Sequence, residues 1–136
     1  MQSADYVLKC DIRKYFPSIN HNVLKRQLSL QVQCGGLQRL IAQIIDSYTA
    51  SVRVPDSGLP LGNQTSQFFG NVYLNSFDHF VMRDLGCKRY IRYVDDFVLL
   101  SDSKSELHDW QDEIVEYLDT MVRLSLHPAK VFVQPV

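Results

Sequence analysis

Residues 89–101 read RYIRYVDDFVLLS, and this stretch decides the fold. Two runs rich in Tyr, Ile, Val, Phe and Leu are separated only by Asp95 and Asp96, a spacing that predicts a β-hairpin with the two aspartates at its tip. Such a tip ordinarily holds Asn-Gly or Asp-Gly, because a two-residue turn favours positive φ. Two carboxylates at the edge of an apolar core instead concentrate negative charge and call for a counter-ion, and a divalent cation suits that role.

The chain before the hairpin predicts one strand followed by helices. Residues 5–12 (DYVLKCDI) alternate in polarity, which is typical of a strand. The predicted helix over 64–84 carries an apolar stripe that includes Phe68, and we expect this stripe to be buried. The elements expected here are a strand over 5–12, a helix capped by Asn20 and stopped by Gly35 and Gly36, a helix over 37–48, a loop over 51–63, and a helix over 64–84 ended by Gly86.

The chain after the hairpin predicts a helix and a last strand. Ser103 and Glu106 form an S-x-x-E capping box before an amphipathic run, and residues 124–133 favour a strand. The resulting order is strand, helices, strand, strand, helix, strand. This order predicts an α+β fold in which an antiparallel sheet has helices packed on one face, the split βαβ or ferredoxin-like arrangement.

The composition is that of one globular domain with a single core. Of the 136 residues, 46% are hydrophobic and 21% are charged. No apolar run approaches the ~18 residues of a membrane span, and the N-terminal stretch lacks the layout of a signal peptide, so we expect a cytoplasmic protein with no membrane partner. Cys10, Cys34 and Cys87 form no CxxC pattern, which favours reduced structural thiols.

The charges are unevenly distributed along the chain. The net charge of −1 by itself argues against a nucleic-acid partner. Residues 101–120 hold seven acids and one base, however, whereas residues 1–40 hold six bases and two acids. A polyanion could therefore bind away from the acidic helix, because salt screens exposed charges beyond about 8 Å. The alternative is that both clusters are solvated faces.

Three aspartates form a candidate metal site. Asp11 ends the first predicted strand and joins Asp95 and Asp96 if that strand lies beside the hairpin. Carboxylates suit Mg²⁺, which prefers oxygen ligands and keeps positions for phosphate and water. Two such ions would activate a 3′-hydroxyl and stabilise a leaving pyrophosphate. The alternative is a set of solvated turn residues.

Four segments together resemble the palm motifs of reverse transcriptases, the RNA-directed DNA polymerases. They are DIRKYF at 11–16, GLPLGNQTSQFFGNVYLN at 58–75, YVDD at 93–96 and LSLHPAK at 124–130. The match is colinear over nearly the whole chain, and four motifs in order are more specific than any one. The chain is most similar to the bacterial branch of group II intron, retron and diversity-generating-retroelement enzymes, nearest the last because of the segment LGNQTSQ.

The resemblance implies a two-metal catalytic centre. Asp11, Asp95 and Asp96 would bind two Mg²⁺ ions, or Mn²⁺ as an alternative, with the carbonyl of Ile12 as a further ligand. Lys130 matches the lysine proposed to protonate the departing pyrophosphate, and the alternative is a surface lysine.

The resemblance also assigns nucleotide-binding residues. Arg13, Lys14 and Tyr15 lie where the family's backbone meets the incoming triphosphate. Phe16 matches the aromatic steric gate, whose ring excludes a 2′-hydroxyl by clash and so selects deoxynucleotides. The alternative for Phe16 is ordinary core packing.

A third set of residues would contact template and primer. Gly62 would let the backbone approach a base closely. Leu61 stands where glutamine is common in the family, and Gln67 where proline is common. The missing amide at position 61 removes a potential hydrogen bond near the nucleotide, which puts the fidelity of copying in doubt. The predicted template and primer contacts are Leu61, Gly62, Asn63, Gln67, Tyr93 and Val94.

The resemblance implies that residues 1–136 are the palm segment of a longer enzyme whose fingers and thumb lie outside the chain. We expect RNA-templated DNA synthesis with an RNA template, a DNA primer, dNTPs and an accessory protein as partners, and no activity from the segment alone. One alternative is another palm-type nucleotidyl transferase, such as a cyclase. Another is a degenerate reverse-transcriptase-like domain that binds RNA or a partner protein without templated synthesis.

Overall fold

A computed structural model describes residues 3–48 and 55–136. The chain divides into two compact units, where the sequence predicts a single core. Unit 1 comprises Met1–Arg13 and Ser76–Val136, and unit 2 comprises Lys14–Asn75. The second core arises because the helices within residues 14–75 pack on one another.

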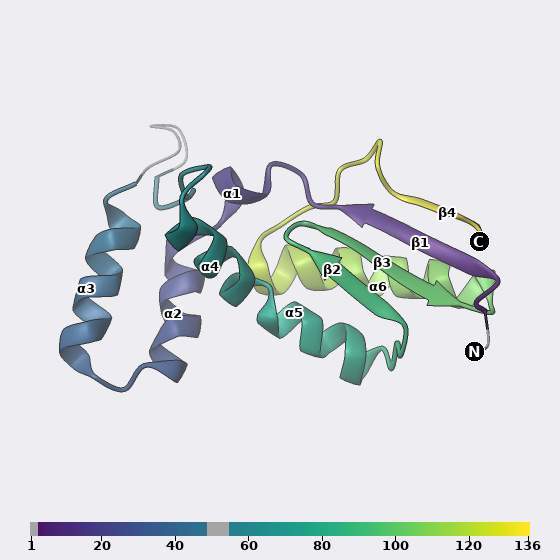
Figure 1. Ribbon diagram of the computed structural model, residues 1–136, viewed down its shortest axis with the longest axis horizontal. Coiled ribbons are helices and arrows are strands. Elements are labelled where there is room, and N and C mark those ends of the chain that lie inside the picture. The colour runs from purple at the N-terminus through teal and green to yellow at the C-terminus, as the bar shows by residue number, and fades with distance from the viewer. Residues whose placement is uncertain (1–2, 49–54) are drawn as a thin grey trace. The chain divides into compact units, whose positions relative to one another are not determined.

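Unit 1 is built on a four-stranded antiparallel sheet (Figure 1). Its strands are β1 (Tyr6–Asp11), β2 (Tyr90–Tyr93), β3 (Asp96–Ser101) and β4 (Phe132–Pro135). Their order is β2-β3-β1-β4, so β1 lies between the hairpin and the C-terminal strand. The antiparallel sheet of the predicted ferredoxin-like arrangement is therefore confirmed.

The pairing register separates a buried face of this sheet from an open one. Leu8 pairs with Leu99 and Cys10 with Phe97, and all four side chains are at most 1% exposed. Because side chains alternate along a strand, the residues between them lie on the other face. Ile91, on that face, is 65% exposed. The sheet thus has one face in the core and one open to solvent.

Helices cover the buried face, as the sequence predicts. Figure 1 shows α6 (Lys104–Val122) lying along the sheet, and α6 contacts β1, β3 and β4. In α5 (Asn75–His79), the Phe77 ring lies 5.0 Å from Phe97 of β3 and 5.9 Å from Tyr117 of α6, measured between centroids. Aromatic packing therefore joins α5, the sheet and α6 in one core.

The N-terminus of α6 only partly follows the predicted capping box. The Ser103 hydroxyl oxygen accepts the Glu106 N–H at 3.3 Å, as expected for an N-cap. The Glu106 carboxylate instead accepts the hydroxyl of Ser101, whose oxygen in turn accepts the Ser103 N–H at 3.0 Å. The helix start is thereby tied to the end of β3.

The single helix expected over 64–84 is broken into three pieces. They are α4 (Gln64–Tyr73), α5 and the π-helix η1 (Phe80–Asp84), and Gly86 follows at φ 70°. The expectation of a continuous buried stripe is wrong at Phe68, which is 59% exposed, whereas Phe69 is 5% exposed. Phe68 and Phe69 are neighbours within α4 and point to different sides of the helix, so only one of them is buried.

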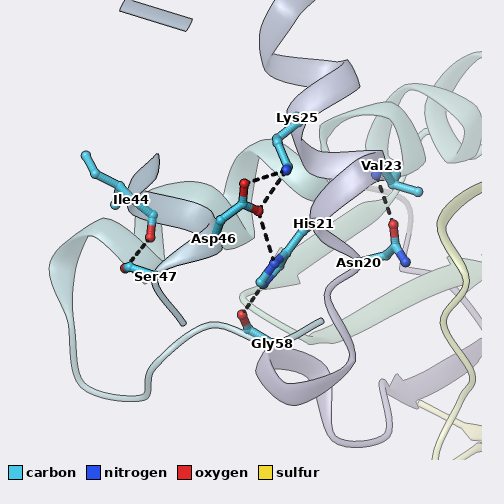
Figure 2. A network of polar contacts seen from close by, with 8 residues as sticks. All are labelled: Asn20, His21, Val23, Lys25, Ile44, Asp46, Ser47 and Gly58. Atoms are coloured by element: carbon cyan, nitrogen blue, oxygen red, sulfur yellow. Dashed lines mark hydrogen bonds and ion pairs between the residues drawn. The ribbon is translucent and has the colours of Figure 1, made fainter. Parts of the chain in front are cut away.

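Unit 2 is helical, with α1 (Tyr15–Ser18), α2 (His21–Gln31), α3 (Gly35–Asp46) and α4. The Asn20 side chain accepts the Val23 N–H at 3.1 Å, which confirms the predicted cap (Figure 2). Gly35 and Gly36 begin α3, and α2 has already ended at Gln31. The prediction that these glycines stop the preceding helix is therefore wrong, because they are the first residues of the next one.

The loop before α4 is fastened to the start of α2. The His21 N–H donates to Asp56 O at 2.9 Å, and the Gly58 N–H donates to Ile19 O at 2.8 Å. The buried His21 ring donates from Nε2 to Gly58 O at 2.7 Å, while its Nδ1 lies 3.7 Å from an Asp46 oxygen (Figure 2). Residues 51–54 of the predicted loop lie outside the described residues.

Two further observations concern the cysteines and the helices. Cys10, Cys34 and Cys87 are all free thiols, and burial raises the pKa of Cys10 to about 12. In the part of the chain that the structure describes, every helix is too short or too polar to cross a bilayer.

Candidate active site in unit 1

The ends of β1 and β3 bring two of the predicted aspartates together. Asp11 and Asp96 are direct partners in the antiparallel register, and Asp96 also pairs with Tyr93 of β2. Directly paired residues point to the same face with Cβ atoms about 5 Å apart. This row lies on the open face of the sheet, where Tyr93 is 79% exposed. Two carboxylates and an aromatic ring thus share an accessible edge.

The hairpin turn consists of Val94 and Asp95, so the prediction of an Asp95-Asp96 tip is wrong by one residue. The Tyr93–Asp96 pair extends the ladder, which leaves only two residues to reverse the chain. Val94 has φ 57°, a conformation that costs a β-branched residue energy. The Asp95 carbonyl accepts the Ile12 N–H at 3.1 Å, so the turn is joined to the end of β1.

The electrostatics of the turn disfavour a charged Asp95. Burial is the largest cause that raises the pKa of Asp95, and the neighbouring carboxylates of Asp11 and Asp96 raise it further. Lys130 acts in the opposite direction, as does a hydrogen bond from the residue's own backbone. Negative charge is therefore crowded here, and a bound cation would relieve it.

Lys130 provides one positive charge at the site. Its Nζ lies 2.8 Å from Asp11 Oδ2, and this hydrogen bond is the largest cause that raises the pKa of Lys130. The segment before it is fixed to the same strand, because the His127 N–H donates to Asp11 O at 2.7 Å and Ile12 bridges to Leu126. The structure thus brings the predicted lysine into contact with one of the predicted aspartates, Asp11.

The donor set fits magnesium, although it is not a complete protein cage. Among residues 3–48 and 55–136, no three His, Cys, Asp or Glu side chains are gathered in a metal-holding group. Mg²⁺ usually takes only one or two carboxylates from the protein and completes its shell with water and substrate phosphates. Asp11 and Asp96, which are paired on the open face of the sheet, can supply two such carboxylates. The three-aspartate metal site therefore stays a prediction.

The predicted triphosphate residues divide between the two units. Arg13, in unit 1, donates its backbone N–H to Ser125 O at 2.8 Å. In unit 2, Lys14 has φ 45° and precedes α1. Tyr15 is 2% exposed, and its hydroxyl donates to the Gly70 carbonyl. The backbone of Arg13 and the ring of Tyr15 thus have structural partners of their own.

Phe16 packs within unit 2. Its ring centroid lies 5.2 Å from that of Tyr15. A Cβ added to Gly70 would meet the Phe16 ring at 3.2 Å, so the ring rests on the backbone of α4. Its assignment as a steric gate stays a prediction.

The predicted template residues of unit 2 lie at the start of α4. Leu61 is 75% exposed, and Gly62 has φ 73°, which favours glycine. The Asn63 side chain caps α4 by accepting the Thr65 N–H at 2.8 Å, and Gln67 is exposed. Asn63 thus has a structural role whatever it binds.

Arg92 was missed by the sequence interpretation, although it touches the turn. Its Nη1 donates to Val94 O at 2.8 Å, and its other nitrogens contact Asp78 of α5. A signal was available in the run YIRYV, because the strand alternation that places Tyr93 on the open face places Arg92 on the buried one. A charge at a core-facing position requires a partner.

The fold is similar to that of solved telomerase structures. Telomerase from Candida albicans in complex with the TWJ fragment of telomeric RNA matches 97% of this chain at a TM-score of 0.73 and 14% identity. Apo telomerase from Candida tropicalis truncated from its C-terminal domain matches 100% at a TM-score of 0.69 and 15% identity. The chain spans only 27% and 31% of those chains. These likenesses confirm the predicted palm-like α+β fold.

The family follows from the sequence match. Comparison with curated proteins gives no match. The model of the family "Reverse transcriptase (RNA-dependent DNA polymerase)" matches residues 1–134, which is nearly the whole chain. The chain therefore belongs to the reverse transcriptase family.

Proposed function

We propose that this chain is the catalytic palm segment of an RNA-directed DNA polymerase that acts by two-metal nucleotidyl transfer. The observation that carries the proposal is the pairing of Asp11 with Asp96, next to Asp95, in a chain that matches the family over residues 1–134. The segment LGNQTSQ favours the bacterial retroelement branch, nearest the diversity-generating retroelements.

The protein's own residues would bind and orient the reacting groups. Asp11, Asp95 and Asp96, with the carbonyl of Ile12, would hold two Mg²⁺ or Mn²⁺ ions. When bound, these ions lower the pKa of the primer 3′-hydroxyl and neutralise charge on the phosphates. The Lys130 ammonium, which contacts Asp11, would give a proton to the departing pyrophosphate.

The resemblance assigns further residues to the selection and alignment of substrates. Arg13, Lys14 and Tyr15 would meet the triphosphate, and Phe16 would exclude a 2′-hydroxyl. The exposed ring of Tyr93 would support the primer terminus, together with Val94. Leu61, Gly62, Asn63 and Gln67 would contact the template.

The partners in this proposal are an RNA template, a DNA primer, dNTPs and an accessory protein, in the cytoplasm. The chain spans less than a third of its telomerase neighbours, so we propose that templated synthesis needs more protein than this segment. Robust primer extension by the 136 residues alone would contradict that part.

Primer extension by the full-length protein tests the proposal. The assay compares RNA and DNA templates with dNTPs or NTPs, in Mg²⁺, in Mn²⁺ and in EDTA. We expect Asp95→Asn to lower extension by at least about a hundredfold, because it removes charge where the metals would bind. The matched control is Asp102→Asn at the far end of the same hairpin, where Asp102 pairs with Arg89 and full activity is expected.

Two outcomes would overturn the assignment. Full activity of Asp95→Asn would remove the metal role of the turn. RNA binding without any synthesis by the wild-type protein, measured by filter binding in the same buffers, would favour the degenerate binding domain.

A further inference from the structure

A largely buried ion pair contacts the hairpin turn of unit 1. Arg92 donates to Asp78 through two nitrogens, Nε to Oδ1 and Nη2 to Oδ2, each at 2.7 Å. The Tyr90 hydroxyl donates to Asp78 Oδ1, also at 2.7 Å. The side chains of Arg92 and Asp78 are 10% and 20% exposed. The guanidinium is therefore held in a fixed, two-pronged geometry.

A third nitrogen of the same guanidinium, Nη1, contacts the turn. Arg92 Nη1 donates to Val94 O at 2.8 Å, and Val94 has φ 57°. A β-branched residue persists in this conformation only where its surroundings hold it there. The next residue, Asp95, accepts the Ile12 N–H through its carbonyl at 3.1 Å. A continuous line of contacts thus runs from α5 through Arg92 and the turn to the end of β1.

A surface ion pair at the other end of the hairpin provides a contrast. Arg89 contacts Asp102 at 3.0 Å, and these side chains are 36% and 60% exposed. Exposed pairs contribute little to stability. The Arg92–Asp78 pair is much less exposed, and removing such charges from water is costly, so its presence next to the turn points to a geometric requirement there.

We propose that Arg92 is a positioning residue, anchored on Asp78, that holds the Val94 carbonyl and thereby fixes the turn that presents Asp95 and Asp96. The structural part of this proposal stands on unit 1 alone, whereas its effect on synthesis rests on the proposed function. Lysine cannot replace arginine here, because one ammonium cannot make the fork to Asp78 and also reach the turn.

Hydrogen exchange on this chain tests the structural part without any activity. The Ile12 amide reports on the turn, because it donates to Asp95 O, and the Leu100 amide reports on the far end, because it donates to Arg89 O at 2.9 Å. We expect Arg92→Lys to speed exchange at Ile12 by about tenfold or more and to leave Leu100 unchanged. The matched control Arg89→Lys should leave Ile12 unchanged.

Two further variants distinguish a local effect on the turn from a general loss of stability. Asp78→Asn keeps a side chain of the same size but removes the charged anchor of Arg92, and it should also speed Ile12 exchange selectively. Tyr90→Phe removes only the third donor to Asp78 and should have a smaller effect. Unchanged exchange at Ile12 in Arg92→Lys and Asp78→Asn, or equal acceleration at Ile12 and Leu100 in both, overturns the proposal.

Kinetics of the full-length protein test the catalytic part. Arg92→Lys should lower kcat by about tenfold to a hundredfold with an unchanged KM for dNTP, because misplaced carboxylates affect the reacting centre. Unchanged kcat beside faster Ile12 exchange would overturn the catalytic role. If the wild type makes no DNA, the proposed function fails, and the exchange experiment alone decides the role of Arg92 in the turn.

Discussion

Helices α6 and α3 are both amphipathic but are buried very differently. In α6, Leu107, Ile114 and Leu118 are 0% exposed against the sheet of unit 1. In α3, Ile45 is the buried residue, while Leu40 is 53% exposed. A periodic pattern therefore predicts that a helix forms and which face is apolar. It does not predict what covers that face.

The largest expected effect tests this contrast directly. Leu118→Ala in α6 should lower the free energy of unfolding by about 2–5 kcal/mol, because it opens a cavity in a closed core. Leu40→Ala in α3 should change it by no more than about 0.5 kcal/mol. Urea unfolding followed by circular dichroism measures both. Equal losses would show that the face of α3 is buried in solution.

Two glycines sharpen the comparison within unit 2. Gly70→Ala in α4 should destabilise the fold by about 1–3 kcal/mol, since the new Cβ would lie 3.2 Å from the Phe16 ring and 3.4 Å from the Tyr15 ring. Gly36→Ala in α3 meets nothing closer than 4.0 Å and should stabilise by about 0.5–1 kcal/mol. The same urea titration distinguishes the signs. A stabilised Gly70→Ala would mean that the rings move aside freely.

Within unit 1, the hairpin turn holds a β-branched residue, Val94, in an unfavourable backbone conformation. Val94→Gly should raise the free energy of unfolding by about 0.5–1 kcal/mol, because glycine adopts φ 57° without the penalty of a branched side chain. Thermal unfolding of the two chains compares them. Val98→Gly serves as the control, since Val98 lies within β3 in ordinary strand geometry, and there glycine should destabilise. A loss at position 94 would contradict the idea of strain.

The smallest effect concerns the charge of Asp95. Its pKa is raised in the folded state, so ionisation of this group opposes folding as the pH rises above its ordinary value of 3.8. Asp95→Asn should therefore stabilise the fold at pH 7 by up to about 1 kcal/mol, and the gain should disappear at about pH 3, where aspartate is protonated in both states. Urea titrations at the two pH values measure the difference. A loss of stability at pH 7 would show that the charge is already well compensated.

Local patterns predicted much of the sheet and of the site. The strand ending at Asp11 and the hairpin follow from alternation, and the resemblance to reverse transcriptases pointed to Lys130, which the structure places at Asp11. The turn was misplaced by one residue because Val94 is a poor sequence signal for positive φ. The position of the turn depends on which two residues form the last pair of the hairpin, here Tyr93 and Asp96, and composition does not reveal this pair.

The contacts that sequence could not predict join distant elements. Arg92 lies in β2 and Asp78 in α5, and the hydrophobic pattern predicts each element by itself. Their pairing depends on how α5 packs against the sheet, which the pattern does not contain. The breaks between α4, α5 and η1 were also invisible, because periodicity averages over a whole segment. The division into two units was not predicted for the same reason. The hydrophobic pattern shows which helix faces are apolar but not which elements cover them.

The strand order β2-β3-β1-β4 also has a practical consequence for handling the protein. Within the described sheet, β2 and β4 each have hydrogen-bonding groups on one side that no neighbouring strand uses, and β2 carries the exposed Ile91. Such borders can recruit strands from other copies and lead to aggregation. Their length of four residues keeps that tendency weak, so dilute samples should stay monodisperse while concentrated ones self-associate.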